Sequence, residues 1–425
     1  MIKRIKISYP KITLFATIAL VLSLFWSCDS ESDPSEQENM DKTPYVTGIG
    51  VSLATRSSDD NGGEDDKSFD LDELIPYSLT FNENTILQIS QQTRTINPFQ
   101  NEDVTYDFAY IPGSEGASWD NEASYNFTPY KMDDPLEWNK IAEGGSLNGG
   151  FALYCMYFPI ENKLREKEGE YGATNYYVMA DQSTVENLKK SDILGAYHST
   201  PTIFSRIRFR LFHLMTYVRI RLFVPVYDVE KNTGYREGAL QYATLNNVTP
   251  DFAIDWSAIR SSDTQGPAVS PLAGDGEIKM YQHPLAEGKT EHEIVEIKYK
   301  DYLRDGYFDQ GIDGDYDKVR VYDFSVIIPN QRGTVGEDGK ESNFTSTDFL
   351  NFYLRTNSGA ITRYYFNQAF SANTNESMLE MNEGIFQYLQ LYVPRVGNQV
   401  VFVGAKVNPW NQMGTNMLLT PEEVE

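Results

Sequence analysis

The chain has 425 residues, a formal net charge of -25 at pH 7 and 13% aromatic residues. So large a negative charge repels phosphate backbones and argues against nucleic acid as a partner. At about 100 to 200 residues per domain, the length predicts two domains. The cysteines are Cys28 and Cys155, and if Cys28 is modified, Cys155 has no partner for a disulfide, so stability must come from packing.

The first 27 residues have the pattern of an export signal. Basic residues, among them Lys3, Arg4 and Lys6, precede an apolar run from 12 to 26, and Ser27 is a small residue just before Cys28. The alternative is a membrane-spanning helix, but the run is shorter than the ~20 apolar residues that such a helix needs. The segment resembles a bacterial lipoprotein signal, which implies a signal peptide over residues 1 to 27 and a lipid on Cys28 that holds the chain to the outer membrane.

Residues 28 to 43 form an acidic tether, because Asp, Glu, Ser, Gln and Asn cannot bury enough apolar surface to order the chain. Residues 45 to 56 then predict a strand with a β-branched, glycine-punctuated pattern. A second acidic linker, residues 57 to 66, follows at once. We expect a strand flanked on both sides by flexible chain to detach without dragging core residues with it.

Beyond this linker, short strand-like segments recur between turn signals, and helical periodicity is scarce. The best helix covers residues 183 to 194, with Ser183 as N-cap and Glu186 in the capping-box position. Tight turns are predicted at residues 357 to 359 and at Gly397 and Asn398. The spacing predicts an all-β protein of β-sandwich type, with an N-terminal domain over residues 44 to 200 and a C-terminal domain over residues 201 to 425.

The run from residue 203 to residue 224 alternates arginine with apolar residues. The apolar residues occupy odd positions up to Leu211 and even positions from Val218 onward. One regular strand cannot change this parity, so we expect two strands joined between Phe212 and Thr216. The arginines form either a basic stripe for an anionic ligand or, more commonly, a solvated face paired with local carboxylates.

Residues with catalytic or metal-binding chemistry are scattered. Residues 309 to 317 hold Asp309, Asp313, Asp315 and Asp317, which have the oxygen ligands that calcium prefers, but Lys318 stands where an EF-hand loop has glycine. The four histidines, His198, His213, His283 and His292, show no zinc spacing. Cys155 lies in an apolar strand pattern, which favours a buried, inert thiol. No nucleophile, phosphate-binding or dinucleotide motif is present, so the sequence predicts no enzyme activity, no cofactor and no metal.

The order of these elements resembles the fimbrillin family, the pilin-like lipoproteins of Bacteroidetes. The likeness rests on the lipoprotein signal, a first strand ending in Thr55 and Arg56, the segments 191 to 196 and 212 to 222, and a late strand ending near Trp410. It implies two tandem transthyretin-like β-sandwich domains and a structural, adhesive subunit of surface fimbriae. Its partners are then other fimbrial subunits and a ligand on a host or bacterial surface.

The resemblance also implies a way of assembly. In polymerising members an arginine-specific protease cuts after the first strand, and a strand from a neighbour fills the groove that is left. Arg56 is the matching position, although an ordinary exposed arginine after a strand is the alternative. Few residues follow Trp410, so either a late strand such as residues 400 to 407 is donated or the chain is an accessory tip or anchor.

Two further classes compete with this interpretation. A surface glycan-binding lipoprotein is also built of tandem β-sandwiches, and its candidate sugar-stacking residues are Trp119, Trp138, Trp256 and the many tyrosines. A mostly helical outer-membrane transporter partner is disfavoured by the scarcity of helical patterns.

Overall fold

The structure is a computed structural model, and it describes the residues 45–53, 75–90, 99, 105–114, 116–119, 122–130, 135–138, 151–161, 176–200, 207–256, 268–272, 276–298, 316–329, 350–366, 384–395, 397–409 and 417–419. These residues form three sheets, and the predicted all-β class is confirmed. The number of domains and their limits stay a prediction.

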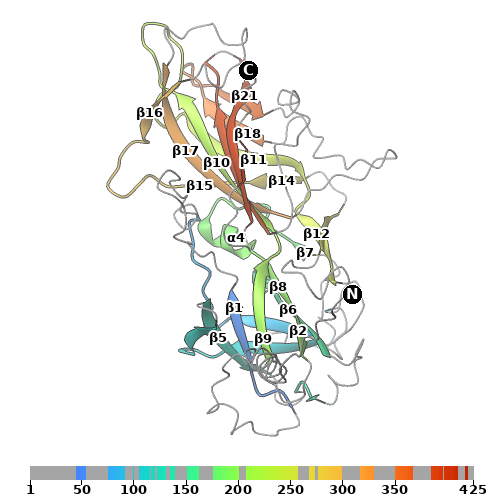
Figure 1. Ribbon diagram of the computed structural model, residues 1–425. Helices are drawn as coiled ribbons and strands as arrows, with labels where there is room; N and C mark the ends of the chain where they lie inside the picture. Colours follow the sequence, from blue (N-terminus) through green and yellow to red (C-terminus); the bar gives the residue numbers. More distant parts are fainter. Residues whose placement is uncertain are drawn as a thin grey trace, which may run out of the picture. The chain divides into compact units, whose positions relative to one another are not determined.

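The first sheet, here called the ring sheet, has eight strands in the spatial order β1-β9-β8-β6-β2-β3-β5-β4. Its strands are β1 (Ile49–Leu53), β2 (Ile86–Ser90), β3 (Thr105–Tyr110), β4 (Gly116–Trp119), β5 (Glu122–Pro129), β6 (Phe151–Tyr157), β8 (Leu194–Thr200) and β9 (Ile207–His213). Because β1 also pairs with β5, seven of these strands close into a ring, and β4 lies outside it beside β5. Figure 1 shows β1 between β5 and β9.

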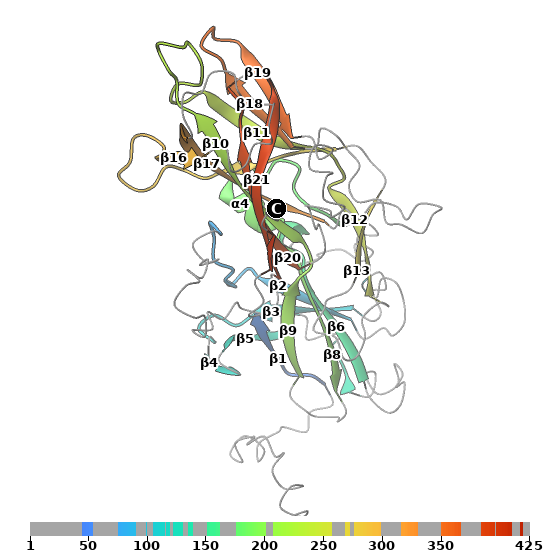
Figure 2. The same ribbon diagram turned by 45° about the horizontal axis from the view of Figure 1, so that its top comes forward.

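The second sheet, here called the long sheet, has eleven strands. Its strands are β10 (Thr216–Pro225), β11 (Leu240–Val248), β14 (Gly276–Lys279), β15 (Tyr281–Gln282), β16 (Ile294–Lys298), β17 (Tyr316–Ile328), β18 (Leu350–Arg355), β19 (Ile361–Phe366), β20 (Ile385–Tyr392), β21 (Gln399–Pro409) and β22 (Met417–Leu419). A small third sheet contains β7 (Tyr176–Tyr177), β12 (Asp251–Asp255) and β13 (Ala268–Pro271). Figure 2 shows the β18 and β19 hairpin beside β11 in the long sheet.

The chain passes from the ring sheet to the long sheet within two residues. Strand β9 ends at His213 and β10 begins at Thr216, so the predicted break between Phe212 and Thr216 is confirmed. The apolar side chains change parity here because the two strands belong to different sheets and face different cores. The domain joint predicted after residue 200 lies between β8 and β9, which are both strands of the ring sheet.

Strand β6 has apolar residues on both faces because both faces are buried. Leu153, Cys155 and Tyr157 pack in the core inside the ring sheet, whereas Tyr154 and Met156 pack in the larger core shared by the other elements. The ring of Tyr154 meets the edge of Trp256 at 5.6 Å between centroids. A strand buried on both faces reads as a continuous apolar run rather than as an alternating one.

The predicted helix is shorter than expected, and its N-cap is one residue later. Helix α4 covers Val185–Lys190, and the hydroxyl of its N-cap, Thr184, accepts a hydrogen bond from the backbone N–H of Asn187. The assignment of Ser183 as N-cap is therefore wrong, because the backbone N–H of Ser183 instead donates to Asp181. Glu186 does not close a capping box but lies 2.7 Å from Lys190, one turn later. Within the described residues, no helix is long and apolar enough to cross a membrane.

Both predicted turns are confirmed. Strands β18 and β19 pair antiparallel around Gly359, which has a φ of 88°. Strands β20 and β21 pair antiparallel around Gly397, also with a φ of 88°. Such positive φ values favour glycine because it has no Cβ to clash.

Candidate functional site: the closing strand of the ring sheet

Strand β1 is paired along both of its edges. On one side it runs parallel to β9, with Ile49 opposite Ile207 and Leu53 opposite Leu211. On the other side it runs antiparallel to β5, with Ile49 opposite Phe127 and Ser52 opposite Ser124. The strand that the sequence places first is therefore the one that closes the ring.

The inward face of β1 is part of the core of the ring sheet. Ile49, Val51 and Leu53 are 2%, 0% and 7% exposed, and Val46 just before the strand is 1% exposed. Burial of each such side chain contributes about 1.5 to 3 kcal/mol as an upper estimate. The expectation that this strand detaches without dragging core residues is therefore wrong, because its own side chains fill the ring.

The outward face of β1 carries only small residues. Gly50 and Ser52 alternate with the core residues and are buried as well, Ser52 with 2% exposure. Their neighbours in register are Arg208 and Arg210 of β9 and, on β5, Asn126 and Ser124. Both arginine side chains are exposed.

The chain is held just before β1, close to the start of the described residues. The backbone N–H of Val46 donates to the carbonyl of Leu136 at 2.8 Å, and Tyr45 forms a bridge with Glu137. Cys28 and Arg56, the two residues that the sequence predicts for lipidation and for protease processing, lie outside the described residues, as do both acidic linkers. In sequence, Arg56 lies three residues after Leu53, the last residue of β1.

Removal of β1 would open the ring along two edges. The backbone N–H and C=O groups of β9 and β5 that now pair with β1 would lose their partners. Such a gap, lined by unpaired backbone groups above an apolar core, is the kind of site that an added strand fills. The geometry is thus that of a strand-binding groove occupied by the chain's own first strand.

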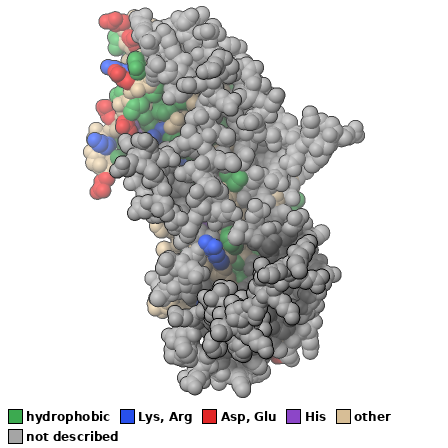
Figure 3. All heavy atoms as spheres, viewed as in Figure 1, with side chains coloured by type: hydrophobic (Ala, Val, Ile, Leu, Met, Phe, Trp, Pro, Cys, Tyr) green, Lys and Arg blue, Asp and Glu red, His purple; other side chains and the backbone are tan. Residues whose placement is uncertain are grey.

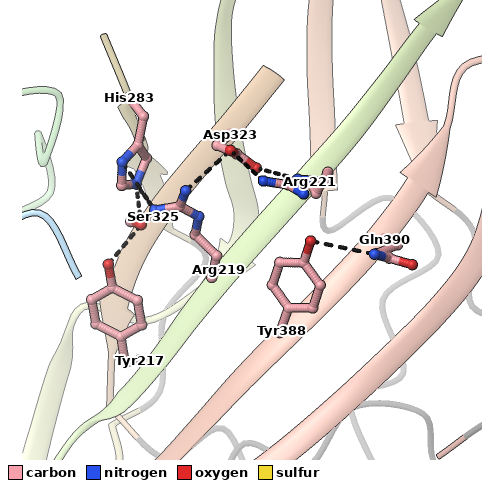
Figure 4. A network of polar contacts seen from close by, with 8 residues as sticks. All are labelled: Tyr217, Arg219, Arg221, His283, Asp323, Ser325, Tyr388 and Gln390. Atoms are coloured by element: carbon pink, nitrogen blue, oxygen red, sulfur yellow. Dashed lines mark hydrogen bonds and ion pairs between the residues drawn. The ribbon is translucent and has the colours of Figure 1, made fainter. Parts of the chain in front are cut away.

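The arginines of β10 form a second cluster, on the long sheet (Figure 4). Arg221 holds Asp323 of β17 with two hydrogen bonds of 3.0 Å, and Arg219 lies 3.1 Å from the same carboxylate. The expectation that the arginines pair with a local carboxylate is therefore confirmed for Arg219 and Arg221. The expectation of a solvated face is wrong for Arg219, which is only 5% exposed. Sequence reasoning missed Asp323, since no sequence pattern shows that it lies opposite Arg221.

His283 completes this cluster from the other side of β17. Its ring nitrogens lie 2.9 and 2.6 Å from a guanidinium nitrogen of Arg219, and Nε2 is 2.6 Å from the hydroxyl of Ser325. The hydroxyl of Tyr217 in turn donates to Ser325 at 2.7 Å. Burial, together with the charge of Arg219, lowers the pKa of His283 to about 3. Burial alone would raise the pKa of Asp323, but the hydrogen bond from Arg221 and the charges of both arginines hold it below its usual value.

The other residues singled out in the sequence have structural surroundings. Cys155 is fully buried, and burial raises the pKa of its thiol, as expected for an inert cysteine. His213 is partly buried and lies 2.6 Å from the carboxylate of Asp192. Of the four candidate calcium ligands, Asp309, Asp313 and Asp315 lie outside the described residues, and Asp317 forms an ion pair with Arg395 at 2.5 Å.

The candidate sugar-stacking tryptophans do not form an exposed surface within the described residues. Trp138 and Trp256 are 7% and 0% exposed, so they pack in the cores. Trp119 lies on β4, outside the closed ring. Over β16 and β17, apolar side chains mix with acidic and basic ones (Figure 3) rather than forming an apolar patch. Among the described residues, no three His, Cys, Asp or Glu side chains gather where they could hold a metal ion.

No protein-family model matches the chain, and no curated protein matches it. Among solved structures it is similar to a candidate cell adhesion protein from Bacteroides ovatus ATCC 8483, with 10% identity, a TM-score of 0.42, and coverage of 87% of this chain and 99% of that chain. It is also similar to the tip fimbrial protein Mfa3 from Porphyromonas gingivalis with C-terminal truncation, at 9% identity, a TM-score of 0.36, and coverage of 85% and 98%. The fimbrial anchor protein Mfa2 from the same organism has 9% identity, a TM-score of 0.32, and coverage of 85% and 97%. These similar structures are described as cell adhesion and fimbrial proteins.

Proposed function

We propose that the chain is a structural and adhesive subunit of cell-surface fimbriae, exported as a lipoprotein through Cys28 and assembled by strand exchange after cleavage at Arg56. Its partners are other fimbrial subunits, a ligand on a host or bacterial surface, and the outer membrane, to which the lipid holds it before cleavage. It works as a building element and not as an enzyme.

The observation that carries this proposal is the position of β1. The strand pairs with β5 and β9 and fills the ring core, so its loss creates a complete strand-binding groove in one step. Cleavage after Arg56 separates residues up to 56 from everything that follows, and in sequence these residues include both Cys28 and β1. One cut therefore severs both the lipid and β1 from the subunit, and the groove opens when the severed strand is displaced from β5 and β9.

The alternative function, binding of surface glycans, has no comparable support. Two of its three candidate tryptophans are buried in the cores, where their rings cannot stack on a sugar. Retention of the soluble mature chain on an immobilised-glycan gel would be the result that favours this alternative.

Mass spectrometry of the N-terminus tests the proposal directly. The chain is isolated from cells with and without an inhibitor of arginine-specific proteases, beside the variant Arg56→Gln and the control Arg236→Gln, which changes an exposed arginine of the long sheet's β10–β11 connection. We expect wild type and Arg236→Gln to begin at Ser57 and to assemble, and Arg56→Gln or inhibited cells to keep acylated Cys28 and stay monomeric. An acylated Cys28 on the assembled wild-type protein, or normal assembly of Arg56→Gln, contradicts the proposal.

A further inference from the structure

We infer that the groove of β1 selects its occupant by size, and that the occupant comes from a different kind of chain rather than from a late segment of a second copy of this one. This inference rests on the proposed strand exchange and adds the chemistry of the partner strand. The partner carries large apolar residues at alternate positions and Gly, Ala or Ser between them.

The register of β1 defines this pattern. Three positions, Ile49, Val51 and Leu53, point into the ring core and need large apolar side chains. The two positions between them, Gly50 and Ser52, point away from that core but are also buried. Ser52 is only 2% exposed, so a longer side chain at this position would have to displace the atoms that cover it.

Strand β1 itself contributes no charge to its outward face, so small size is the property that its residues share there. The positions beside Gly50 and Ser52 belong to Arg208 and Arg210 on β9, and to the uncharged Asn126 and Ser124 on β5. A lysine or arginine at an outward position of the incoming strand would meet both the arginines and the lack of space. An occupant is therefore selected by alternation of large apolar and small neutral residues.

The sequence of this chain contains that pattern once. Across all 425 residues, only Ile49 to Leu53 has Val, Ile, Leu, Met, Phe, Tyr or Trp at positions one, three and five with Gly, Ala or Ser at positions two and four. Cleavage at Arg56 would separate this segment from the rest of the subunit, and residues 57 to 425 do not contain the pattern.

The late segments of the chain fail for separate reasons. Strand β22 has a large side chain at each of its three positions, Met417, Leu418 and Leu419, so either register turns at least one of them outward. Strand β21, which includes residues 400 to 407, is embedded in the long sheet, where it pairs with β20 along its length and with β19 and β22 on its other side. Donation of β21 would dismantle that sheet, so the prediction that residues 400 to 407 are donated is the less favourable one.

Peptide binding tests the rule on the processed protein. The mature chain is cut with an arginine-specific protease, the released N-terminal fragment is removed, and labelled peptides are added and followed by fluorescence anisotropy. The peptides are residues 45 to 56, the same peptide with Gly50→Leu and Ser52→Leu, a control with Thr47→Leu at a position exposed in the structure, and residues 411 to 425. We expect the first and the control to bind equally, the double variant to bind at least about tenfold more weakly, and the tail peptide not to bind.

The outcomes separate the inference from the proposed function. Binding of the native peptide together with equal binding of the double variant or of the tail peptide overturns the size rule alone. Failure of every peptide to bind, on protein that was cut and stays folded, overturns strand exchange and the size rule with it.

A second measurement uses the intact chain and needs no cleavage. Ser52→Leu is expected to lower the melting temperature clearly, whereas Thr47→Leu leaves it unchanged. Equal melting temperatures for the two variants contradict the size rule as well.

Discussion

The strand β1 of the ring sheet and the strand β10 of the long sheet occupy equivalent places and are held by different chemistry. Each lies between a parallel and an antiparallel neighbour: β1 between β9 and β5, and β10 between β20 and β17. Each also points a row of large apolar residues into a core. Equivalent position in a sheet thus does not mean equivalent side-chain chemistry.

Length is the first difference. Strand β1 has five residues, and β10 has ten, all of which pair with β17. A longer strand makes more backbone hydrogen bonds, each with a net contribution of about 0.5 to 1.5 kcal/mol. Replacing β10 would therefore require a much longer partner segment.

Charge is the second difference. The outward positions of β10 include Arg219 and Arg221, which share Asp323 of β17, whereas those of β1 are Gly50 and Ser52. An ion pair in a central strand fixes one register, because a shift by one residue turns the charges into the core. Strand β1 has no such ion pair, so in the proposed strand exchange size and alternation would select the strand that replaces it.

The substitution Val51→Asp is expected to have the largest effect on stability, and it tests whether β1 is a core strand. Val51 is 0% exposed at the centre of β1, so the variant places a carboxylate among the apolar side chains of the ring core. We expect a loss of at least about 5 kcal/mol in the free energy of unfolding, comparable with the whole stability of a domain. Thermal and urea unfolding of this variant beside Thr47→Asp, at an exposed position just before the strand, measures the effect. If both variants unfold alike, β1 is not a core strand.

The substitution Asp323→Ala removes the carboxylate that pairs with Arg219 and Arg221 of β10. It leaves Arg219 buried without its carboxylate, and breaking a buried pair by removing one partner costs about 3 to 5 kcal/mol. The matched control is Glu296→Ala, which removes an exposed ion pair with Lys318 from the neighbouring pair of strands and should change stability by less than about 1 kcal/mol. Equal urea midpoints for the two variants would show that the buried pair does not hold β10 in place.

Much of this architecture is predictable from local pattern. The parity change between Leu211 and Val218 located the passage from one strand to the next, because a strand has a side-chain period of two. The positive φ of Gly359 and Gly397 corresponds to turns that their sequences already indicate. The existence of β1 followed from its β-branched residues, and the inert surroundings of Cys155 followed from its apolar strand.

The rest depends on pairing between distant segments, which a single sequence does not encode locally. Nothing in residues 49 to 53 indicates that β9 is their parallel neighbour, about 158 residues later. The partner of Arg219 and Arg221 could not be chosen among the many carboxylates of an acidic chain. The N-cap of α4 was misplaced by one residue because Ser183 and Thr184 are both good caps, and only the hydrogen bonds distinguish them.

The substitution His283→Asn is expected to change the pH dependence of the free energy of unfolding, and its effect is the smallest of the three. His283 belongs to the β10 cluster, and its pKa of about 3 lies well below its value in an unfolded chain. Between these two pKa values the unfolded chain binds a proton that the folded chain does not bind. The contribution of neutral His283 to the free energy of unfolding is therefore fully present above about pH 6.5. It is lost as pH falls toward 3, by at most about 1.4 kcal/mol per pH unit. Asparagine keeps a hydrogen-bonding side chain but cannot titrate, so urea unfolding of the variant should show a shallower decline from pH 7 to pH 5 than the wild type. His213→Asn is the control for a histidine of the ring sheet, away from the β10 cluster. A wild-type slope that His283→Asn leaves unchanged would mean that the β10 cluster does not depend on a neutral imidazole, and Arg219 would then need another acceptor.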